Sequence, residues 1–336
     1  MKLRFLSTSA LALILPGLAQ AQDVTLIVNC FMPPQHFLCS QLLPGWLADV
    51  EAATGGRVSG LVLPTSAAPP PDQLAATEAG QVDVAVQFNG LIPGDTVGAR
   101  VAMVPFSGSD SAERNSAALW ATTRAFFPDE FPNVELLSQF VISPVQLYSL
   151  GDQPLESLAD LESRRVWALP GPLAAIGSAI GAGVVSTPAV ESRDILSRGV
   201  VDASIGPEPH SVENMQLTGY IRSLTSFERP LYTSSFSMMM NSGTWGRISP
   251  EDQEAIRGVS GEVFARRAGA AWDAANVEVL QHFADAGVVT VRADAAFNAD
   301  MQQSAAFLND AWLAEAAAAG GDGAAALAFY RAAVED

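Results

Sequence analysis

The chain has 336 residues, of which 36 are Asp or Glu and 18 are Lys or Arg, so its formal net charge is −18. A surface this acidic repels nucleic acids and anionic lipids, and we expect neither as a partner. An anionic small molecule is still compatible with this charge, because one local arginine can dominate a pocket. The length is sufficient for two domains, each with its own core.

The first 21 residues have the pattern of a secretory signal peptide. Lys2 and Arg4 precede the apolar run Leu11–Leu15, and Ala19-Gln20-Ala21 forms a small-x-small cleavage site. The apolar run is too short to anchor the protein across a bilayer, and the alternative is an N-terminal core helix. We expect cleavage after Ala21, export, and no direct insertion into the membrane.

The two cysteines, Cys30 and Cys39, lie close together after this segment. An exported protein is in an oxidising compartment, where such a pair can form a disulfide. A bridge would staple one short loop that contains His36. Two buried free thiols are the alternative, and the sequence leaves both open.

The next part of the chain alternates strands with helices. β-Branched and apolar runs predict strands, whereas apolar residues at helical spacing predict helices that end at Gly55 and Gly80. The elements expected in chain order are a strand at 24–29, a helix at 36–53, a strand at 57–63, a proline-rich loop at 65–71, a helix at 72–80 and a strand at 82–88. This order is typical of a parallel sheet covered by helices.

The later part repeats this architecture without repeating the sequence. The expected elements are a strand at 165–169, helices at 172–182 and 192–198, and strands at 200–205 and 233–241. We therefore expect a second α/β unit beside the first.

A long helix follows these elements. Ser249 is a suitable N-cap, Pro250 fits the first helical position, and the apolar stripe continues to Phe283. About 36 helical residues span roughly 54 Å, which exceeds one small domain. We expect this helix to act as a strut across two lobes, followed by two alanine-rich helices at about 296–318 and 323–334.

Motifs of the common enzyme classes are missing from the sequence. There is no G-x-S-x-G nucleophile elbow, no phosphate loop and no dinucleotide-binding glycine pattern. His36, His210 and His282 are too scattered for a zinc cluster. We therefore expect a binding protein rather than an enzyme, without cofactor or metal, whose ligand lies at the C-terminal ends of parallel strands.

Several segments are similar to the sequence motifs of one protein family and occur in the same order along the chain. Gly80–Ala85 is similar to a G-x-V-D-hydrophobic-A stretch, Val104-Pro105-Phe106 to Leu-Pro-Phe, and Leu196–Asp202 to L-Q-x-G-V-V-D-G. Asn241–Ile256, which contains Ser-Pro-Glu-Asp-Gln, is similar to N-x-x-x-W-x-x-L-S-P-E-D-Q-x-A-I. Together they resemble the solute-binding proteins of TRAP transporters, the DctP-like family, over nearly the whole chain after residue 21.

The resemblance implies an α/β fold of two lobes, a Venus flytrap, that closes on one small organic solute. It also implies a periplasmic monomer whose partners are the permease subunits of an ion-gradient-driven transporter. The expected N-terminal lobe is 22–143 plus about 233–270, the expected C-terminal lobe is 144–232 plus about 271–318, and 319–336 is a C-terminal helix. A sensor that delivers the solute to a receptor, or an exported enzyme on the same scaffold, are the alternatives.

The chain departs from this family at the residue that identifies the solute. In most members of the family that the chain resembles, the strand after the D-L-K-G motif carries an arginine that clamps the solute carboxylate with two hydrogen bonds. Counting from Asp160 places Trp167 at this position, and counting back from Pro170 places Ala168 there. Neither is an arginine, so the usual carboxylate cargo needs another partner.

Two hypotheses for the solute follow from this departure. In the first, Trp167 and Phe88 stack on a planar, neutral or cationic solute. In the second, the solute is an organic acid, and Arg165, protonated His210 or backbone N–H groups replace the arginine. Packing of Trp167 between strand and helix is the structural alternative. The complete set of candidate ligand-binding residues is Asn29, His36, Gln87, Phe88, Asn89, Arg165, Trp167, Gly206, Glu208 and His210.

Overall fold

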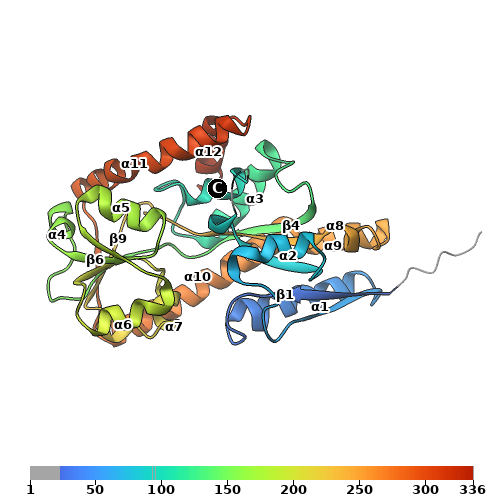
Figure 1. Ribbon diagram of the computed structural model, residues 1–336, viewed down its shortest axis with the longest axis horizontal. Helices are drawn as coiled ribbons and strands as arrows, with labels where there is room; N and C mark the ends of the chain where they lie inside the picture. Colours follow the sequence, from blue (N-terminus) through green and yellow to red (C-terminus); the bar gives the residue numbers. More distant parts are fainter. Residues whose placement is uncertain (1–22, 93, 95, 336) are drawn as a thin grey trace, which may run out of the picture.

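The computed structural model describes residues 23–335 except 93 and 95, so the expected signal peptide lies outside the described residues. The described strands form two separate sheets, which are the centres of two lobes (Figure 1). No helix among the described residues is long and apolar enough to cross a membrane. The two-lobe α/β fold that the sequence predicted is confirmed.

The sheet of the first lobe has the order β2-β1-β3-β10-β4. Its strands β1, β2 and β3 are parallel, and β10 is antiparallel to both of its neighbours. The expected strands at 24–29, 57–63, 82–88 and 233–241 are confirmed with small shifts of their ends. The strand bounds are β1 Val24–Asn29, β2 Val58–Val62, β3 Val84–Phe88, β4 Val134–Val141 and β10 Ser235–Asn241.

The sheet of the second lobe has the order β11-β9-β5-β8-β6-β7. Among the described strands of this sheet, only β5 is antiparallel to its neighbours. The expected strands β6 and β8 are parallel to each other, and β7, which the sequence did not predict, pairs in parallel with β6. The strand bounds are β5 Leu147–Ser149, β6 Arg165–Ala168, β7 Gly183–Ser186, β8 Ala203–Ile205, β9 Ser223–Ser226 and β11 Val289–Arg292.

Twelve α-helices cover these sheets in the described part of the chain. The helix expected at 36–53 begins with a π-helical turn at Leu38–Leu42 and becomes regular at Leu43. The helix bounds are α1 Leu43–Ala53, α2 Gln73–Glu78, α3 Ala112–Phe126, α4 Leu158–Glu162, α5 Pro172–Ile180, α6 Ser192–Ser197, α7 Pro209–Asn214, α8 Ser242–Trp245, α9 Pro250–Val259, α10 Gly261–Asp285, α11 Ala295–Ala318 and α12 Gly323–Ala333.

The expected long helix is present over 250–285, with one interruption between α9 and α10. Ser260 leaves the helical region with ψ −147°, and Gly261 has φ +54°, a conformation that favours glycine. The indole Nε1 of Trp46 donates to Ser260 Oγ at 2.9 Å, and Ser138 Oγ donates to the Gly261 carbonyl at 2.7 Å. These contacts fix the break, which the apolar stripe of the sequence does not reveal.

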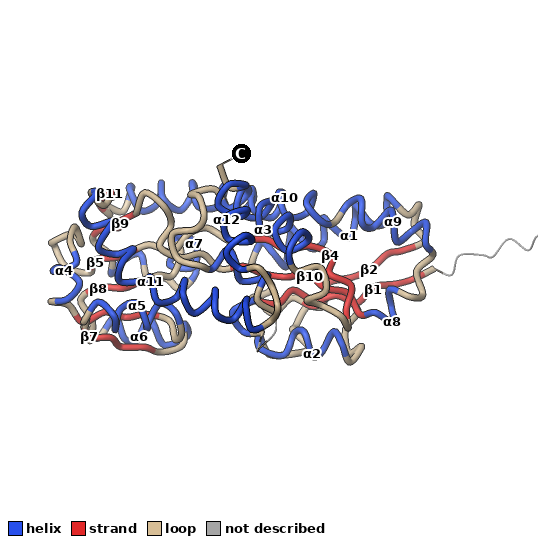
Figure 2. The backbone as a smooth tube through the Cα atoms, turned by 90° about the horizontal axis from the view of Figure 1, so that it is seen from above, coloured by secondary structure: helices blue, strands red, loops and turns tan. Residues whose placement is uncertain are grey.

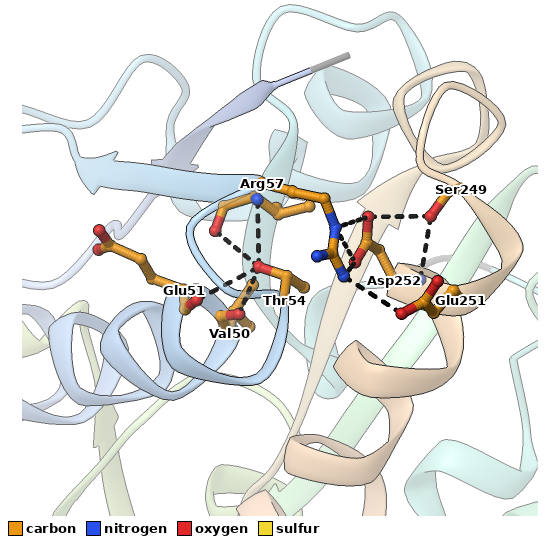
Figure 3. A network of polar contacts seen from close by, with 8 residues as sticks. Val50, Glu51, Thr54, Arg57, Ser249, Glu251 and Asp252 are labelled. Atoms are coloured by element: carbon orange, nitrogen blue, oxygen red, sulfur yellow. Dashed lines mark hydrogen bonds and ion pairs between the residues drawn. The ribbon is translucent and has the colours of Figure 1, made fainter. Parts of the chain in front are cut away.

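The start of α9 is tied to the first lobe by an arginine (Figure 3). Arg57 donates from Nε and Nη2 to the Asp252 carboxylate at 2.7–3.1 Å. The hydrogen bond from Arg57 holds the pKa of Asp252 below its usual range. Ser249 Oγ accepts from Asp252 N at 3.1 Å, which confirms Ser249 as the N-cap.

Two helices run lengthwise from one lobe to the other (Figure 2). On α10, Phe264 and Trp272 lie in the first core, whereas Val279 and Phe283 lie in the second. On α11 the order is reversed, since Phe297 packs in the second core and Trp312 packs against residues of the first. Both helices therefore hold the lobes together and help to enclose the space between them.

Of the two possibilities that the sequence left open for Cys30 and Cys39, the structure has the disulfide, with the two Cα atoms 5.7 Å apart. Both sulfur-bearing side chains are buried in the core of the first lobe. The bridge closes the loop after β1, so it holds His36 and Phe37 at the edge that faces the second lobe.

Candidate functional site

A cavity of about 540 Å³ lies between the two lobes. Its walls come from the end of β3, the segments that connect the lobes, the ends of β6 and β8, and one face of α11. Most lining side chains are apolar. The lining residues are Phe88, Gly90, Leu91, Arg100, Met103, Val104, Pro105, Ile142, Val145, Leu169, Pro170, Gly171, Pro172, Leu173, Pro207, Glu208, Ser211, Met215, Tyr232, Ser234, Leu308, Ala311, Trp312 and Glu315.

Arg100 is the one cation among the described residues that line this cavity. Its side chain is only 22% exposed, and Nη1 lies 2.8 Å from Glu315 Oε2 on α11. Nε donates to the Thr96 carbonyl at 3.0 Å, and Nη2 donates to the Gly94 carbonyl at 3.3 Å. A guanidinium has five N–H groups, and these described contacts use three of them. The other two can donate hydrogen bonds to an acidic solute.

The backbone that carries Arg100 is fixed by Asn89. Arg100 belongs to the 3₁₀ helix Gly98–Met103, and Asn89 Nδ2 donates to the Ala99 carbonyl at 3.0 Å. The same amide donates to Ser235 Oγ at 3.0 Å and accepts from Ser237 Oγ at 2.8 Å. Asn89 is fully buried, so the predicted ligand residue instead positions the arginine.

Glu208 lies on the wall that the second lobe contributes, with only 2% of the residue exposed. It caps α7, where its carboxylate accepts from Ser211 N at 2.7 Å and from Ser211 Oγ at 2.5 Å. Burial raises the pKa of Glu208 to about 7, although the two bonds from Ser211 act in the opposite direction. Near neutral pH this wall of the cavity therefore holds a carboxyl group that titrates.

Trp167 lies in the core and does not line the cavity, which corrects the expectation that it stacks on the solute. It is fully buried, and its Nε1 donates to Thr187 Oγ1 at 3.1 Å. Side chains alternate along a strand. Val166 and Ala168 therefore face one hydrophobic cluster of the second lobe, and Trp167 faces the other, under α7 and α10.

Arg165 also lies away from the cavity, which corrects its proposed role as the replacement for the arginine. It stands at the N-terminal end of β6, whereas the cavity is lined by Leu169 and Pro170 beyond the C-terminal end. Its side chain is 56% exposed and pairs with Asp202 at 3.1 Å. The ion pair and solvent therefore satisfy its charge.

The remaining candidates divide into structural amides and residues near the cleft. Phe88 lines the cavity as expected, whereas the fully buried amides of Asn29 and Gln87 bond only within the first lobe. Gly206 has φ +72° and precedes Pro207 through a cis bond. The glycine itself does not line the cavity, but Pro207 and Glu208 after it do.

His36 and His210 meet each other across the lobes instead of facing the cavity. Their ring centroids are 5.2 Å apart, and both rings pack against Phe37 and Trp272. Burial, with the nearby His210, lowers the pKa of His36 to about 4. Burial also lowers the pKa of His210, so a protonated His210 is a poor replacement for the arginine at neutral pH.

Sequence reasoning missed Arg100, Trp312 and Glu315 as cavity residues. One signal was present, because Arg100 is a lone cation in an otherwise apolar stretch that leads into the motif Val104-Pro105-Phe106. Val104 and Pro105 of that motif line the cavity. No comparable signal marks Trp312 or Glu315, since α11 reads as a helix with no distinct polar face.

The chain is similar to known proteins over nearly its whole length. Residues 31–315 match the family described as bacterial extracellular solute-binding protein, family 7. The protein named outer membrane transporter protein TsaT, from Comamonas testosteroni, is 33% identical over 331 residues, which cover 98% of this chain and 97% of the relative.

Two solved structures place the fold among TRAP periplasmic solute-binding proteins. One, from Bordetella bronchiseptica with bound (R)-mandelate and (S)-mandelate, is 30% identical, covers 93% of this chain and 99% of its own, and has a TM-score of 0.82. Another, from Desulfovibrio salexigens, is 24% identical, covers 93% of this chain and 96% of its own, and has a TM-score of 0.85. These matches confirm the family resemblance seen in the sequence.

Proposed function

The chain belongs to the bacterial extracellular solute-binding proteins of family 7, and from this premise we propose that it captures a small aromatic carboxylate in the interlobe cavity. The solute is then passed to the permease subunits of a TRAP transporter. The observation that carries the proposal is an apolar cavity of about 540 Å³ with Arg100 as the one cation on its described walls.

The walls of the cavity favour an aromatic or similarly apolar body. Phe88 and Trp312 contribute aromatic rings to the lining, and Met103 and Met215 add polarisable side chains. Pockets of this size commonly combine such walls with a few polar groups that orient the ligand. A sugar or an inorganic ion would leave most of this surface without a partner.

Arg100 supplies the polar anchor for the acid group. A carboxylate fits the planar guanidinium with two parallel hydrogen bonds, and half-burial makes this pairing stronger than it is in water. The Glu315 carboxylate occupies part of the fork at 2.8 Å. The solute would therefore share Arg100 with Glu315 or displace it.

The relative from Bordetella bronchiseptica supports the choice of solute class. Its structure holds both enantiomers of mandelate, an aromatic 2-hydroxy acid, and it is 30% identical to this chain over 93% of the length. A protein that binds both enantiomers recognises the shape and the charge of its ligand more than the configuration at the stereocentre. We infer the same general class, an aromatic monocarboxylate, for this chain.

The test is a calorimetric titration of the mature protein with mandelate, phenylacetate and the neutral amide of mandelate. We expect the two acids to bind and the amide to bind at least tenfold more weakly, because charge-assisted hydrogen bonds contribute about 1.5–3 kcal/mol. Arg100→Met should remove that preference. Arg165→Met is the matched control, since it removes the same charge outside the cavity.

Three results would contradict the proposal. Equal binding of the acid and the amide would show that Arg100 does not read a carboxylate. Tighter binding of benzylamine than of mandelate would favour the cationic solute, which Glu208 and Glu315 on the same walls could accommodate. Loss of binding in Arg165→Met but not in Arg100→Met would move the site elsewhere.

A further inference from the structure

A second cavity, of about 510 Å³, lies on the other side of Pro105 from the first. Pro105 lines both cavities, and α11 contributes a different face to each one. Leu308, Ala311, Trp312 and Glu315 face the first. The lining residues of the second are Pro105, Phe106, Arg229, Gln302, Ala305, Ala306, Asn309 and Arg331.

The charged side chains that line this second cavity are positive, whereas the net charge of the protein is negative. The chain has twice as many acidic as basic residues, yet this cavity is lined by two arginines and by no described carboxylate. Arg229 comes from the segment between β9 and β10 that links the lobes, and Arg331 comes from α12. Two cations on one concave wall form a local positive potential, which concentrates small anions.

The two arginines are held near each other although they repel. Burial and the neighbouring charge of Arg229 lower the pKa of Arg331. Arg229 pairs with Glu335, which does not line the cavity, and donates from Nη1 to the Gly108 carbonyl at 3.4 Å. One carboxylate therefore offsets part of two positive charges, and an anion in the cavity would relieve the remaining repulsion.

Polar side chains beside the arginines complete the wall. Gln302 and Asn309 both line the cavity from α11. The buried amide oxygen of Asn309 has no hydrogen-bond partner among the described residues. The amide of Asn309 can rotate by 180° about its Cβ–Cγ bond, which interchanges the positions of oxygen and nitrogen. This group can therefore offer either an acceptor or a donor to a bound molecule.

We propose that this second cavity binds a small oxyanion with two or more negative charges, such as phosphate or a short dicarboxylate. Arg229 and Arg331 bind the oxygens through their planar forks, and the amides of α11 contact the remaining polar edge. The bound anion links the segment between the lobes to α12. It is distinct from the aromatic solute, because the only apolar surface here comes from Pro105, Phe106 and two alanines.

The first experiment uses inorganic phosphate as the probe, with chloride at matched ionic strength as the reference. We expect saturable binding of one phosphate in calorimetry and a rise of the unfolding temperature beyond the effect of chloride. Arg229→Met and Arg331→Met should each weaken the binding about tenfold or more, as expected when one charged partner of a paired site is removed. Arg193→Met, which removes an exposed arginine of α6, should leave it unchanged.

A further variant is expected to have the opposite effect on phosphate binding. Glu335→Gln removes the carboxylate that competes for Arg229, so phosphate should bind as tightly or more tightly than in the wild type. A non-saturable effect of phosphate that is equal in wild type and Arg331→Met would overturn the proposal. Weaker phosphate binding in Glu335→Gln would overturn it as well.

The site is independent of the proposed aromatic-acid site, and the experiment keeps them apart. Phosphate binding should persist in Arg100→Met and in the presence of saturating mandelate. If phosphate competes with mandelate for one site, the second cavity is not the anion site. If mandelate fails to bind while phosphate binding requires Arg331, only the proposed function fails.

Discussion

The two cavities share Pro105 and α11 and are nearly equal in volume, yet their walls differ in charge. The first combines Arg100 with the carboxyl groups of Glu208 and Glu315. The second combines Arg229 with Arg331 and has no described carboxylate on its walls. Volume therefore does not distinguish what the two cavities can hold, whereas the number and pairing of their charges does.

The two cavities also differ in the charges that surround their arginines before a ligand binds. Arg100 is half-buried and already paired with Glu315 at 2.8 Å, so an acidic solute competes with a protein carboxylate. Arg331 faces a like charge, so an anion meets a site that is electrostatically unfavourable when empty. We expect the first cavity to select by shape as well as charge, and the second mainly by charge.

The largest expected effect comes from a residue outside both cavities. Trp167→Ala should lower the free energy of unfolding by roughly 3–5 kcal/mol, because a fully buried indole leaves a void. Chemical denaturation measures this loss. The milder Trp167→Phe should keep the affinity for mandelate and for phosphate within about twofold, as for distant independent sites. If Trp167→Phe keeps its stability but loses mandelate, Trp167 belongs to the first site after all.

The carboxyl group of Glu208 should make the first cavity sensitive to pH. Its pKa in the folded protein is raised to about 7 from 4.5, so the folded state holds the proton more tightly. The resulting stability is fully present below pH 4.5 and is lost as the pH rises through 7, by an amount on the order of 3 kcal/mol. Denaturation of Glu208→Gln between pH 5 and 8 should lack this loss.

The same titration should act on solute binding. A neutral Glu208 does not repel an anionic solute, so the affinity for mandelate should rise as the pH falls from 8 to 6. Glu208→Gln should flatten this dependence. An unchanged pH profile in that variant would show that Glu208 does not face the bound solute.

Measuring the binding of both ligands to both arginine variants tests whether the two cavities act separately. Arg100→Met should weaken mandelate binding by about 2–3 kcal/mol, roughly 30–150-fold, and leave phosphate binding intact. Arg331→Met should do the reverse. Calorimetry of the double variant should give the sum of the two single effects; a departure of more than about 0.5 kcal/mol would show that the cavities are coupled through their shared wall.

The smallest expected effect comes from the carboxylate that competes with the solute. Glu315 is 49% exposed, so its pair with Arg100 contributes at most about 1 kcal/mol. Glu315→Gln should therefore strengthen mandelate binding severalfold at low salt and less at high salt. Weaker binding in this variant would indicate that Glu315 orients Arg100 for the solute instead of competing with it.

Much of the fold could be predicted from the sequence because local chemistry determines it. β-Branched runs became β1 and β3, Ser249 caps α9 as its side chain required, and ordered motifs identified the family. The site was predicted less well. Phe88 and Glu208 do line the cavity, but Asn29, Gln87 and Asn89 turned out to be buried amides with structural partners.

The sequence by itself determined the alternation of strands and helices, the helix cap at Ser249 and the family. These depend on neighbours along the chain or on motifs in a fixed order. Only the tertiary structure decided which arginine faces the cavity and which side of β6 carries Trp167. A parallel strand is covered on both faces, so apolar residues on both sides look alike in the sequence. Arg100 is placed by contacts from Asn89 to Ser235 and Ser237, far along the chain, which no local pattern records.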